Sequence, residues 1–229
     1  MKLKILHLFL SVDRQIEETP QQLRGFMGRE FSKYVELHHH TAKGGGQALI
    51  HAYPRIQYNI HRNRAILVGI GERAILILKN LVIHIENITL GQNTYIVKEI
   101  QMHYEEPEFM VLSPEEKITY EFKSPWLALN ADNYKIFKKA SIPERRSLLQ
   151  KILIGNILSA SKHLGYSVPS TIYVDLEMCP MSVEFKGIIM IGFKGIFETN
   201  FLLPDYIGIG KAVSHGHGIV KKIKSYLDD

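Results

Sequence analysis

The order of strand-like and helix-like patterns in the N-terminal part of the chain constrains the fold more than any other feature. Strand-like segments are short and aliphatic, and helix-like segments repeat apolar residues at helical spacing. In chain order the segments are a strand at 4–11, a helix at 20–34, strands at 55–60 and 65–70, a helix from 72 and a strand at 81–90. The order β-α-β-β-α-β predicts a ferredoxin-like fold, in which both helices cover one face of an antiparallel sheet.

The C-terminal part of the chain shows similar patterns in a less regular order. Its longest helical pattern begins around Pro143 and ends at Gly165. The other segments are a helix at 133–140 and strand-like runs at 94–104, 108–113, 117–124, 170–178, 183–193 and 194–203. We therefore predict an α+β protein of two tandem ferredoxin-like (RRM-like) domains, at 1–91 and 92–229, each an antiparallel sheet with helices on one face.

Composition and charge narrow the class of protein. The 229 residues are 45% hydrophobic and 22% charged, which is ordinary for a globular protein, and the net charge of +5 with a pI near 9.1 favours phosphate-bearing partners. Cys179 is the only cysteine, so we expect no internal disulfide, no zinc cluster built from thiolates, and a cytoplasmic location. No charge-free apolar run approaches the roughly 18 residues of a membrane span, so we expect no membrane partner.

A cluster of histidines and glycines lies between Glu36 and Tyr53, with the sequence ELHHHTAKGGGQALIHAY. Imidazole titrates near pH 6.5 and exchanges a proton at neutral pH, while glycine allows a backbone to approach a bulky anion. The cluster therefore suits proton-transfer chemistry on a phosphate. It also suits a metal site or a polar turn without function, and the segment by itself leaves these alternatives open.

A second glycine-rich segment lies near the C-terminal end of the chain, where Gly208, Gly210, Gly216 and Gly218 enclose Lys211, Ser214, His215 and His217. A nucleotide-binding P-loop is excluded, because Asp205 stands where that pattern requires glycine and Ala212 where it requires Ser or Thr. Paired glycines can still present backbone N–H groups to phosphates, with charge supplied by nearby lysines. A glycine-rich hairpin at a sheet edge explains the spacing equally well.

Four stretches of the chain resemble one known family. The stretch LPDYIGIGKAVSHGHGIV is similar to the C-terminal glycine-rich loop of the CRISPR-associated Cas-six endoribonucleases, which belong to the repeat-associated mysterious protein superfamily. AYPRIQYNI with AILVGIGERAI, LHHH, and SPWLALN are similar to the subtype I-B branch of that family. One position departs from the family pattern, because the residue between the last two loop glycines is usually apolar or aromatic and here is His217.

The resemblance implies an activity and a partner. Such enzymes cut the repeat within a precursor CRISPR transcript (pre-crRNA) without a metal or other cofactor. A base takes the proton of the 2′-hydroxyl, that oxygen attacks the scissile phosphate, and an acid protonates the departing 5′-oxygen, which leaves a 5′-hydroxyl and a 2′,3′-cyclic phosphate. One neutral and one protonated imidazole suit this chemistry. We expect CRISPR repeat RNA as the partner, and subunits of an interference complex and a second copy of the chain remain open as further partners.

Spacing selects among the three consecutive histidines. In an extended segment His38 and His40 would share one face, roughly 6.6 Å apart at about 3.3 Å per residue, and His39 would point away and be dispensable. We therefore predict His38 and His40 as the acid and base. Lys43 would stabilise charge on the phosphate and Tyr53 would orient one of its oxygens, although a surface lysine and a core tyrosine explain these two residues equally well.

The RNA itself is expected to contact basic side chains and the glycine-rich segment. The predicted RNA-binding residues are Arg24, Arg55, Gly208, Gly210, Lys211, Ser214, His215, Gly216, His217, Gly218 and Lys221. Two alternatives from other classes stay open. One is a non-catalytic RNA-binding protein, although the strand at 55–60 offers only Tyr58 for base stacking. The other is a metal-dependent hydrolase using His38, His40 and His51, although Glu36 is the only nearby carboxylate.

Overall fold

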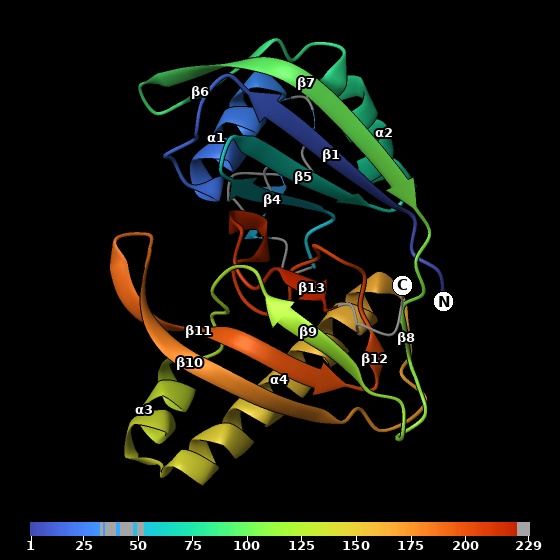
Figure 1. Ribbon diagram of the computed structural model, residues 1–229, viewed down its shortest axis with the longest axis vertical. Coiled ribbons are helices and arrows are strands. Elements are labelled where there is room, and N and C mark those ends of the chain that lie inside the picture. The colour runs from blue at the N-terminus through green and yellow to red at the C-terminus, as the bar shows by residue number, and fades with distance from the viewer. Residues whose placement is uncertain (33, 35–39, 42–47, 50–52, 224–229) are drawn as a thin grey trace. The chain divides into compact units, whose positions relative to one another are not determined.

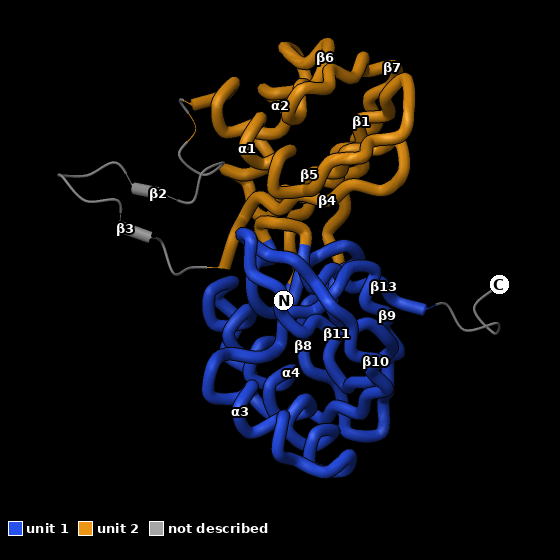
Figure 2. Tube along the Cα trace, turned by 90° about the vertical axis from the view of Figure 1, so that its left-hand side faces the viewer, with its two compact units in different colours: residues 1, 108–213, 217–229 blue, residues 2–107, 214–216 orange. Residues whose placement is uncertain are grey.

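The computed structural model describes residues 1–32, 34, 40–41, 48–49 and 53–223. They form two compact units, which Figure 2 distinguishes by colour. The N-terminal unit comprises residues 2–107 together with 214–216, and the C-terminal unit comprises Met1, residues 108–213 and the chain from His217 on. Each unit has its own sheet, its own helices and its own buried core.

The N-terminal unit is built on an antiparallel sheet of five strands in the order β4-β5-β1-β7-β6. Its elements are β1 (Ile5–Val12), α1 (Pro20–Glu30), β4 (Ile56–His61), β5 (Arg64–Ile70), α2 (Glu72–Val82), β6 (Asn87–Leu90) and β7 (Asn93–Glu105), and the two-residue strands β2 (His40–Thr41) and β3 (Ala48–Leu49) pair with each other. The chain order is the one predicted for a ferredoxin-like fold, and β1 lies at the centre of the sheet.

Local chemistry explains where the two helices of the N-terminal unit begin. The Thr19 hydroxyl accepts a hydrogen bond from the Gln22 N–H, and the Gln22 side chain accepts one in return from the Thr19 N–H, while Pro20 occupies the first turn. Gly71, with φ +89°, provides the turn that leads from β5 into α2. The apolar stripes of both helices join alternate residues of β1 and β5 in one core, with α1 and α2 on the same face of the sheet (Figure 1).

The strand next to β1 is β7, and this pairing extends the N-terminal unit beyond Gly91. The register runs from Ile5 opposite Glu105 to Val12 opposite Val97. Of the predicted strand at 81–90, the first two residues end α2, residues 83–86 connect the two elements, and only the last four residues form the short outer strand β6. The units consequently divide between Pro107 and Glu108 rather than after Gly91, because the long strand that follows Gly91 completes the first sheet.

The C-terminal unit repeats this architecture with one helix replaced. Its elements are β8 (Met110–Val111), β9 (Ile118–Phe122), α3 (Ala131–Lys139), α4 (Ile142–Leu164), β10 (Val174–Phe185), β11 (Ile188–Thr199), β12 (Phe201–Leu202), the 3₁₀ turn η2 (Val213–His215) and β13 (Val220–Lys222). The main sheet has the order β10-β11-β9-β13, so its first strand in the chain, β9, again lies inside the sheet. Between β12 and β13, where the fold pattern expects a second helix, the described chain forms the glycine-rich segment and η2.

Helix α4 and a group of aromatic rings form the core of the C-terminal unit. A capping box between Ser141 and Glu144 begins α4, and Gly165 ends it in the left-handed conformation, as the sequence predicts. Trp126 is fully buried and stacks on Phe122 with 5.4 Å between ring centroids, and Phe122 in turn packs against Phe197.

Two antiparallel sheets with helices packed on them confirm the predicted α+β fold class. Within the described residues, no helix combines the length and the apolar character needed to cross a bilayer.

Strands β10 and β11 form a long hairpin that extends beyond the rest of their sheet. All twelve residues of each strand are paired, whereas β9 pairs only with Ile196–Thr199 of β11. The turn lies at Lys186 and Gly187, inside the segment 183–193 that reads as one strand in sequence. Periodicity does not locate this turn, because apolar residues continue on both sides of it.

Candidate functional site

The predicted acid and base lie in a segment that the structure describes only in part. His38, His39, Lys43 and His51 fall outside the described residues. The backbone of His40 is described and pairs with Leu49 in the small ladder of β2 and β3. This extended conformation at His40 is the one on which the alternation of histidine side chains depends. The roles of His38 and His40 therefore stay predictions.

Tyr53 lies buried at the edge of the N-terminal core, with an exposed fraction of 9%. Its phenol is hydrogen-bonded to Gln57, whose own Nε2 donates to the Pro54 carbonyl oxygen at 3.1 Å. Burial raises the pKa of Tyr53, so the phenol stays protonated at neutral pH. A protonated phenol can donate a hydrogen bond to a phosphate oxygen. The buried position is also that of an ordinary core tyrosine, which the sequence left as the alternative.

Three of the predicted RNA-binding residues meet in the N-terminal unit. Arg24 Nη1 lies 2.7 Å from His215 Nε2, and His215 Nδ1 lies 3.3 Å from Ser214 Oγ. Because a guanidinium only donates hydrogen bonds, Nε2 is the acceptor and the His215 ring is neutral with its proton on Nδ1. Burial lowers the pKa of Arg24, whose positive charge lies close to the buried Tyr58. The contact joins α1 to η2 across 191 positions of sequence.

The glycines of the loop are required by close approach of other groups. A Cβ added at Gly210 would lie 2.6 Å from Trp126 Nε1, and the same Nε1 donates a hydrogen bond to Asn156 Oδ1 at 3.1 Å. A Cβ at Gly208 would lie 2.4 Å from Val213, and one at Gly216 would lie 2.6 Å from Pro20. The loop therefore packs directly on its neighbours, which is the structural explanation that the sequence left open.

Several backbone N–H groups of the loop are used inside the protein. Ile209 N–H donates to the Gly218 carbonyl at 2.8 Å, and Gly218 N–H donates to the Pro125 carbonyl at 3.0 Å. His217 N–H donates to the Ala212 carbonyl at 3.4 Å. These donors are satisfied by carbonyls of the same unit, so they are not available to bind a phosphate in this conformation.

The charged side chains of this region have different environments. Lys211 Nζ donates to the Leu129 carbonyl at 3.1 Å, and burial lowers the pKa of this ammonium. Lys221 Nζ donates to the Tyr206 hydroxyl at 2.8 Å and lies 5.0 Å from the centre of that ring, and the hydrogen bond raises the pKa of Lys221. Lys221, on β13, is thus held by the ring of Tyr206, a kind of contact that leaves a charged head partly in solvent.

His217, the position that departs from the family pattern, packs inside the C-terminal unit. Its ring lies edge-on against Phe185, with 5.4 Å between centroids. Burial lowers the pKa of His217, and its Nδ1 is buried without a hydrogen-bond partner among the described residues. In this place the imidazole contributes to packing at the turn end of the β10–β11 hairpin, where Phe185 is the last residue of β10.

The structure thus brings the predicted residues together in two groups. Arg24, Ser214, His215 and Gly216 form one group in the N-terminal unit, and Gly208, Gly210, Lys211, His217 and Gly218 form the other in the C-terminal unit. Two residues of this region were not predicted from the sequence. Asn156 accepts a hydrogen bond from Trp126, and Tyr206 accepts one from Lys221; in each case the two partners belong to different segments of the chain.

Tyr58, which the sequence offered as a platform for base stacking, is 1% exposed and belongs to the core. No three histidine, cysteine, aspartate or glutamate side chains cluster as a metal site among the residues described here.

Comparison with known proteins decides the family. Residues 1–108 match the model of the Cas6b N-terminal domain, and residues 112–223 match the model of the Cas6b C-terminal domain. The chain belongs to the Cas6b family. The resemblance carried by the glycine-rich loop and the other three stretches is confirmed, and so is the prediction of two tandem domains of the CRISPR-associated ferredoxin-like kind.

Two solved structures agree with membership of the Cas6b family, and the chain also has a relative of similar sequence. A crystal structure of a Cas6b is 32% identical over 97% of this chain and all of that chain, with a TM-score of 0.88. A second, of a CRISPR RNA processing endoribonuclease Cas6b, is 31% identical over 97% of this chain and all of that chain, with a TM-score of 0.76. The uncharacterized protein MJ0978 of Methanocaldococcus jannaschii is 39% identical over 145 residues, which are 63% of this chain and 97% of that protein.

Proposed function

We propose that this Cas6b family member is a metal-independent endoribonuclease that cleaves CRISPR repeat RNA within the precursor transcript and releases mature crRNA. The observation that carries the proposal is the match of both halves of the chain, in order, to a family that includes a CRISPR RNA processing endoribonuclease. The basic pI of about 9.1 supports an RNA substrate, since phosphate charge dominates the affinity of proteins for nucleic acid.

In the proposed mechanism the 2′-hydroxyl attacks the adjacent phosphate in line. One of His38 and His40 removes the hydroxyl proton as a neutral imidazole, and the other protonates the leaving 5′-oxygen as an imidazolium. Lys43 stabilises the charge that develops on the phosphate oxygens, and Tyr53, whose phenol stays protonated, donates a hydrogen bond to one of them. The products are a 5′-hydroxyl and a 2′,3′-cyclic phosphate.

Side chains of both units bind the RNA in this proposal. Arg24 and Arg55 of the N-terminal unit supply guanidinium groups to backbone phosphates, since planar guanidinium suits phosphate oxygens. Lys211 and Lys221 supply ammonium groups from the glycine-rich segment and β13. The neutral His215 accepts a hydrogen bond from Arg24 and so positions that guanidinium rather than providing charge of its own. The loop glycines contribute by keeping the segment in the packed conformation seen here.

The experiment that tests the proposal uses the full-length protein and the repeat RNA of its own host, with EDTA present. We expect cleavage at one site, with 5′-hydroxyl and 2′,3′-cyclic phosphate ends, and complete loss of cleavage when the nucleotide before the cut carries a 2′-deoxy sugar. His38→Ala and His40→Ala should each slow single-turnover cleavage by at least about tenfold while RNA binding is retained.

His39→Ala is the matched control, because it removes the same side chain from the same run of histidines. Cleavage at an unchanged rate by the double variant of His38 and His40 would overturn the site assignment. RNA binding without any cleavage would place the protein among non-catalytic RNA-binding members of the fold. Activity that returns only with a divalent metal would replace the proposed mechanism with metal-dependent hydrolysis.

A further inference from the structure

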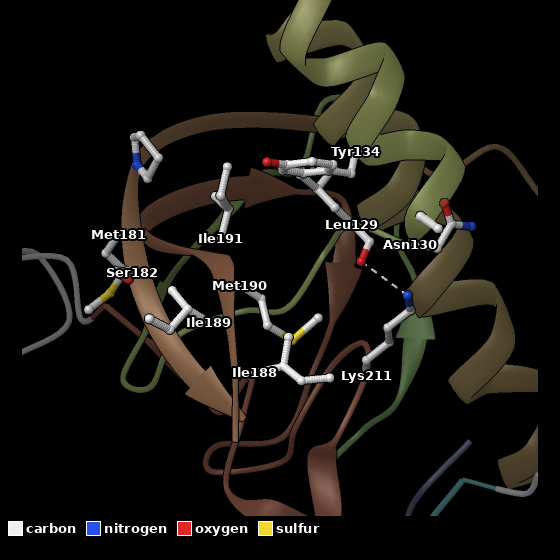
Figure 3. A pocket seen from close by; sticks show the side chains of 12 residues that line it. Leu129, Asn130, Tyr134, Met181, Ser182, Ile188, Ile189, Met190, Ile191 and Lys211 are labelled. Carbon is white, nitrogen blue, oxygen red and sulfur yellow. Dashed lines mark hydrogen bonds between the residues drawn. The ribbon is translucent and has the colours of Figure 1, made fainter. Parts of the chain in front are cut away.

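An open apolar groove lies in the C-terminal unit between α3 and the far end of the β10–β11 hairpin. The cavity has a volume of about 720 Å³. It is lined by Leu129, Asn130, Ala131, Tyr134, Pro180, Met181, Ser182, Ile188, Ile189, Met190, Ile191 and Lys211. Figure 3 shows the aliphatic side chains of the hairpin facing Leu129 and Tyr134 across this space, with Lys211 reaching toward Leu129.

Large apolar side chains stand exposed along this groove. Ile188 is 64% exposed and Ile189 is 77% exposed, and Met181 and Tyr134 are 38% and 40% exposed. A contiguous apolar patch of this kind is uncommon on a protein that works alone, because each exposed side chain orders water that a partner would release. The exposure is therefore best explained by a partner that covers the groove.

The chemistry of the lining favours protein over nucleic acid as the occupant. Isoleucine and methionine side chains offer no flat ring on which a base can stack, and Tyr134 is the one aromatic side chain among the twelve that line the groove. Lys211 is the one cation among them. RNA surfaces on proteins combine many cations with aromatic rings, whereas a helix with an apolar stripe matches a groove lined mainly by aliphatic residues.

The hairpin edge favours a helix over an added strand. β10 is the edge strand of its sheet, and Pro180 stands in the middle of it opposite Phe193 of β11. Proline has no N–H to donate, so it interrupts the ladder that a partner strand would need along this edge. A helix needs no backbone hydrogen bonds from the groove, because its own backbone groups are already paired.

The ammonium of Lys211 favours an occupant of the groove that carries negative charge. One N–H of its ammonium is donated to the Leu129 carbonyl, and no carboxylate contacts Nζ in the part of the chain that the structure describes. Lys211 lines a groove whose other residues are mainly apolar, and burial lowers the pKa of its ammonium. A carboxylate brought by the occupant would favour the charged form and satisfy these donors.

We propose that this groove is a docking site for an amphipathic helix of a protein partner, whose apolar stripe covers Ile188, Ile189 and Tyr134 and whose carboxylate pairs with Lys211. The inference does not rest on the proposed endoribonuclease activity, since the groove lies outside the predicted catalytic segment. It gives Lys211 a second use in addition to the RNA contact proposed above. Variants at the exposed isoleucines therefore separate the two functions.

The test is a selection on the full-length protein with a displayed library of helical peptides of about 16 residues, followed by affinity measurements with the selected peptides made synthetically. We expect enriched peptides to carry apolar residues at positions i, i+3, i+4 and i+7 with an acidic residue beside this stripe. The double variant Ile188→Gln/Ile189→Gln should bind them at least about tenfold more weakly. Replacing the acidic residue by its amide should weaken binding to the unchanged protein but not to Lys211→Met.

The matched control is the double variant Ile83→Gln/Ile142→Gln, since these isoleucines are 76% and 81% exposed and lie outside the groove. It should bind the peptides as the unchanged protein does. The proposal is overturned if no helical peptide is enriched, if the groove variant binds as well as the control, or if the acidic residue is absent from the enriched set. It is also overturned if the groove variant abolishes self-association, which would make a second copy the occupant. Repeat-RNA cleavage by the groove variant should equal that of the control, so failure of the endoribonuclease proposal is scored separately.

Discussion

Replacing Gly218 by alanine should destabilise the C-terminal unit far more than the same replacement at Gly165. Both glycines have positive φ, +68° at Gly218 and +87° at Gly165. A Cβ added at Gly165 meets nothing within 4 Å, whereas a Cβ at Gly218 would lie 2.1 Å from the Ile209 carbonyl oxygen. The two substitutions therefore share the backbone effect and differ only in the collision.

The magnitude follows from these two effects. Alanine in the left-handed region costs about 1–2 kcal/mol, and the lower entropy of its unfolded chain offsets about 0.4–1 kcal/mol of this. Gly165→Ala should thus lower the free energy of unfolding by about 1 kcal/mol. At Gly218, relief of the collision also disrupts the bonds from Ile209 N–H to Gly218 and from Gly218 N–H to Pro125, each worth about 0.5–1.5 kcal/mol. The expected loss is about 2–4 kcal/mol.

Urea denaturation monitored by tryptophan fluorescence is a suitable assay, because Trp126 is the single tryptophan and is buried in the same unit as both glycines. Gly218→Ala should lower the midpoint clearly more than Gly165→Ala, with a similar dependence on urea concentration. Equal losses for the two variants would refute the reasoning, because the close approach of Ile209 would then carry no energetic weight.

Two further predictions concern RNA binding and pH. Lys221→Met should weaken binding of repeat RNA and reduce the slope of log affinity against log salt concentration by about 0.7–0.9, as loss of one phosphate contact would, and an unchanged slope would remove Lys221 from the RNA site. Burial lowers the pKa of His217, so the unfolded chain binds the proton more readily and stability is lost as pH falls from about 6.5 through the folded-state pKa. Between about pH 7.5 and 5.5, His217→Gln should lose less stability than the unchanged protein, and an equal loss would contradict the lowered pKa of His217.

The local patterns of the chain were sufficient to predict most of its helices. Pro143 and the glycine after Leu164 mark the two ends of α4, because such residues act on the nearest turn and need no tertiary partner. The strands at 55–60 and 65–70, which form β4 and β5, were predicted for the same reason, since each is a short β-rich run. The family was likewise readable from four short stretches of sequence.

Tertiary structure decided which strand completes the first sheet and which residues meet at the candidate site. β7 and β6 both have strand-like sequences, and only packing against β1 selects β7 for the inner position. The same is true of Arg24 and His215, which are separated by 191 positions and are joined by folding alone. Contacts of this kind form between segments that are far apart in the sequence. The residues next to each partner therefore carry no information about which distant segment will lie beside it.

The sequence by itself determined the α+β class, the capped helices and the family to which the chain belongs, because these depend on periodicity, capping chemistry and short motifs that neighbouring residues express. Only the tertiary structure decided why the loop glycines are required, how His217 is used and where an apolar groove opens beside Lys211. Each of these depends on the atoms that surround a residue in space, which come from Trp126, Phe185 and the β10–β11 hairpin rather than from its neighbours in the chain.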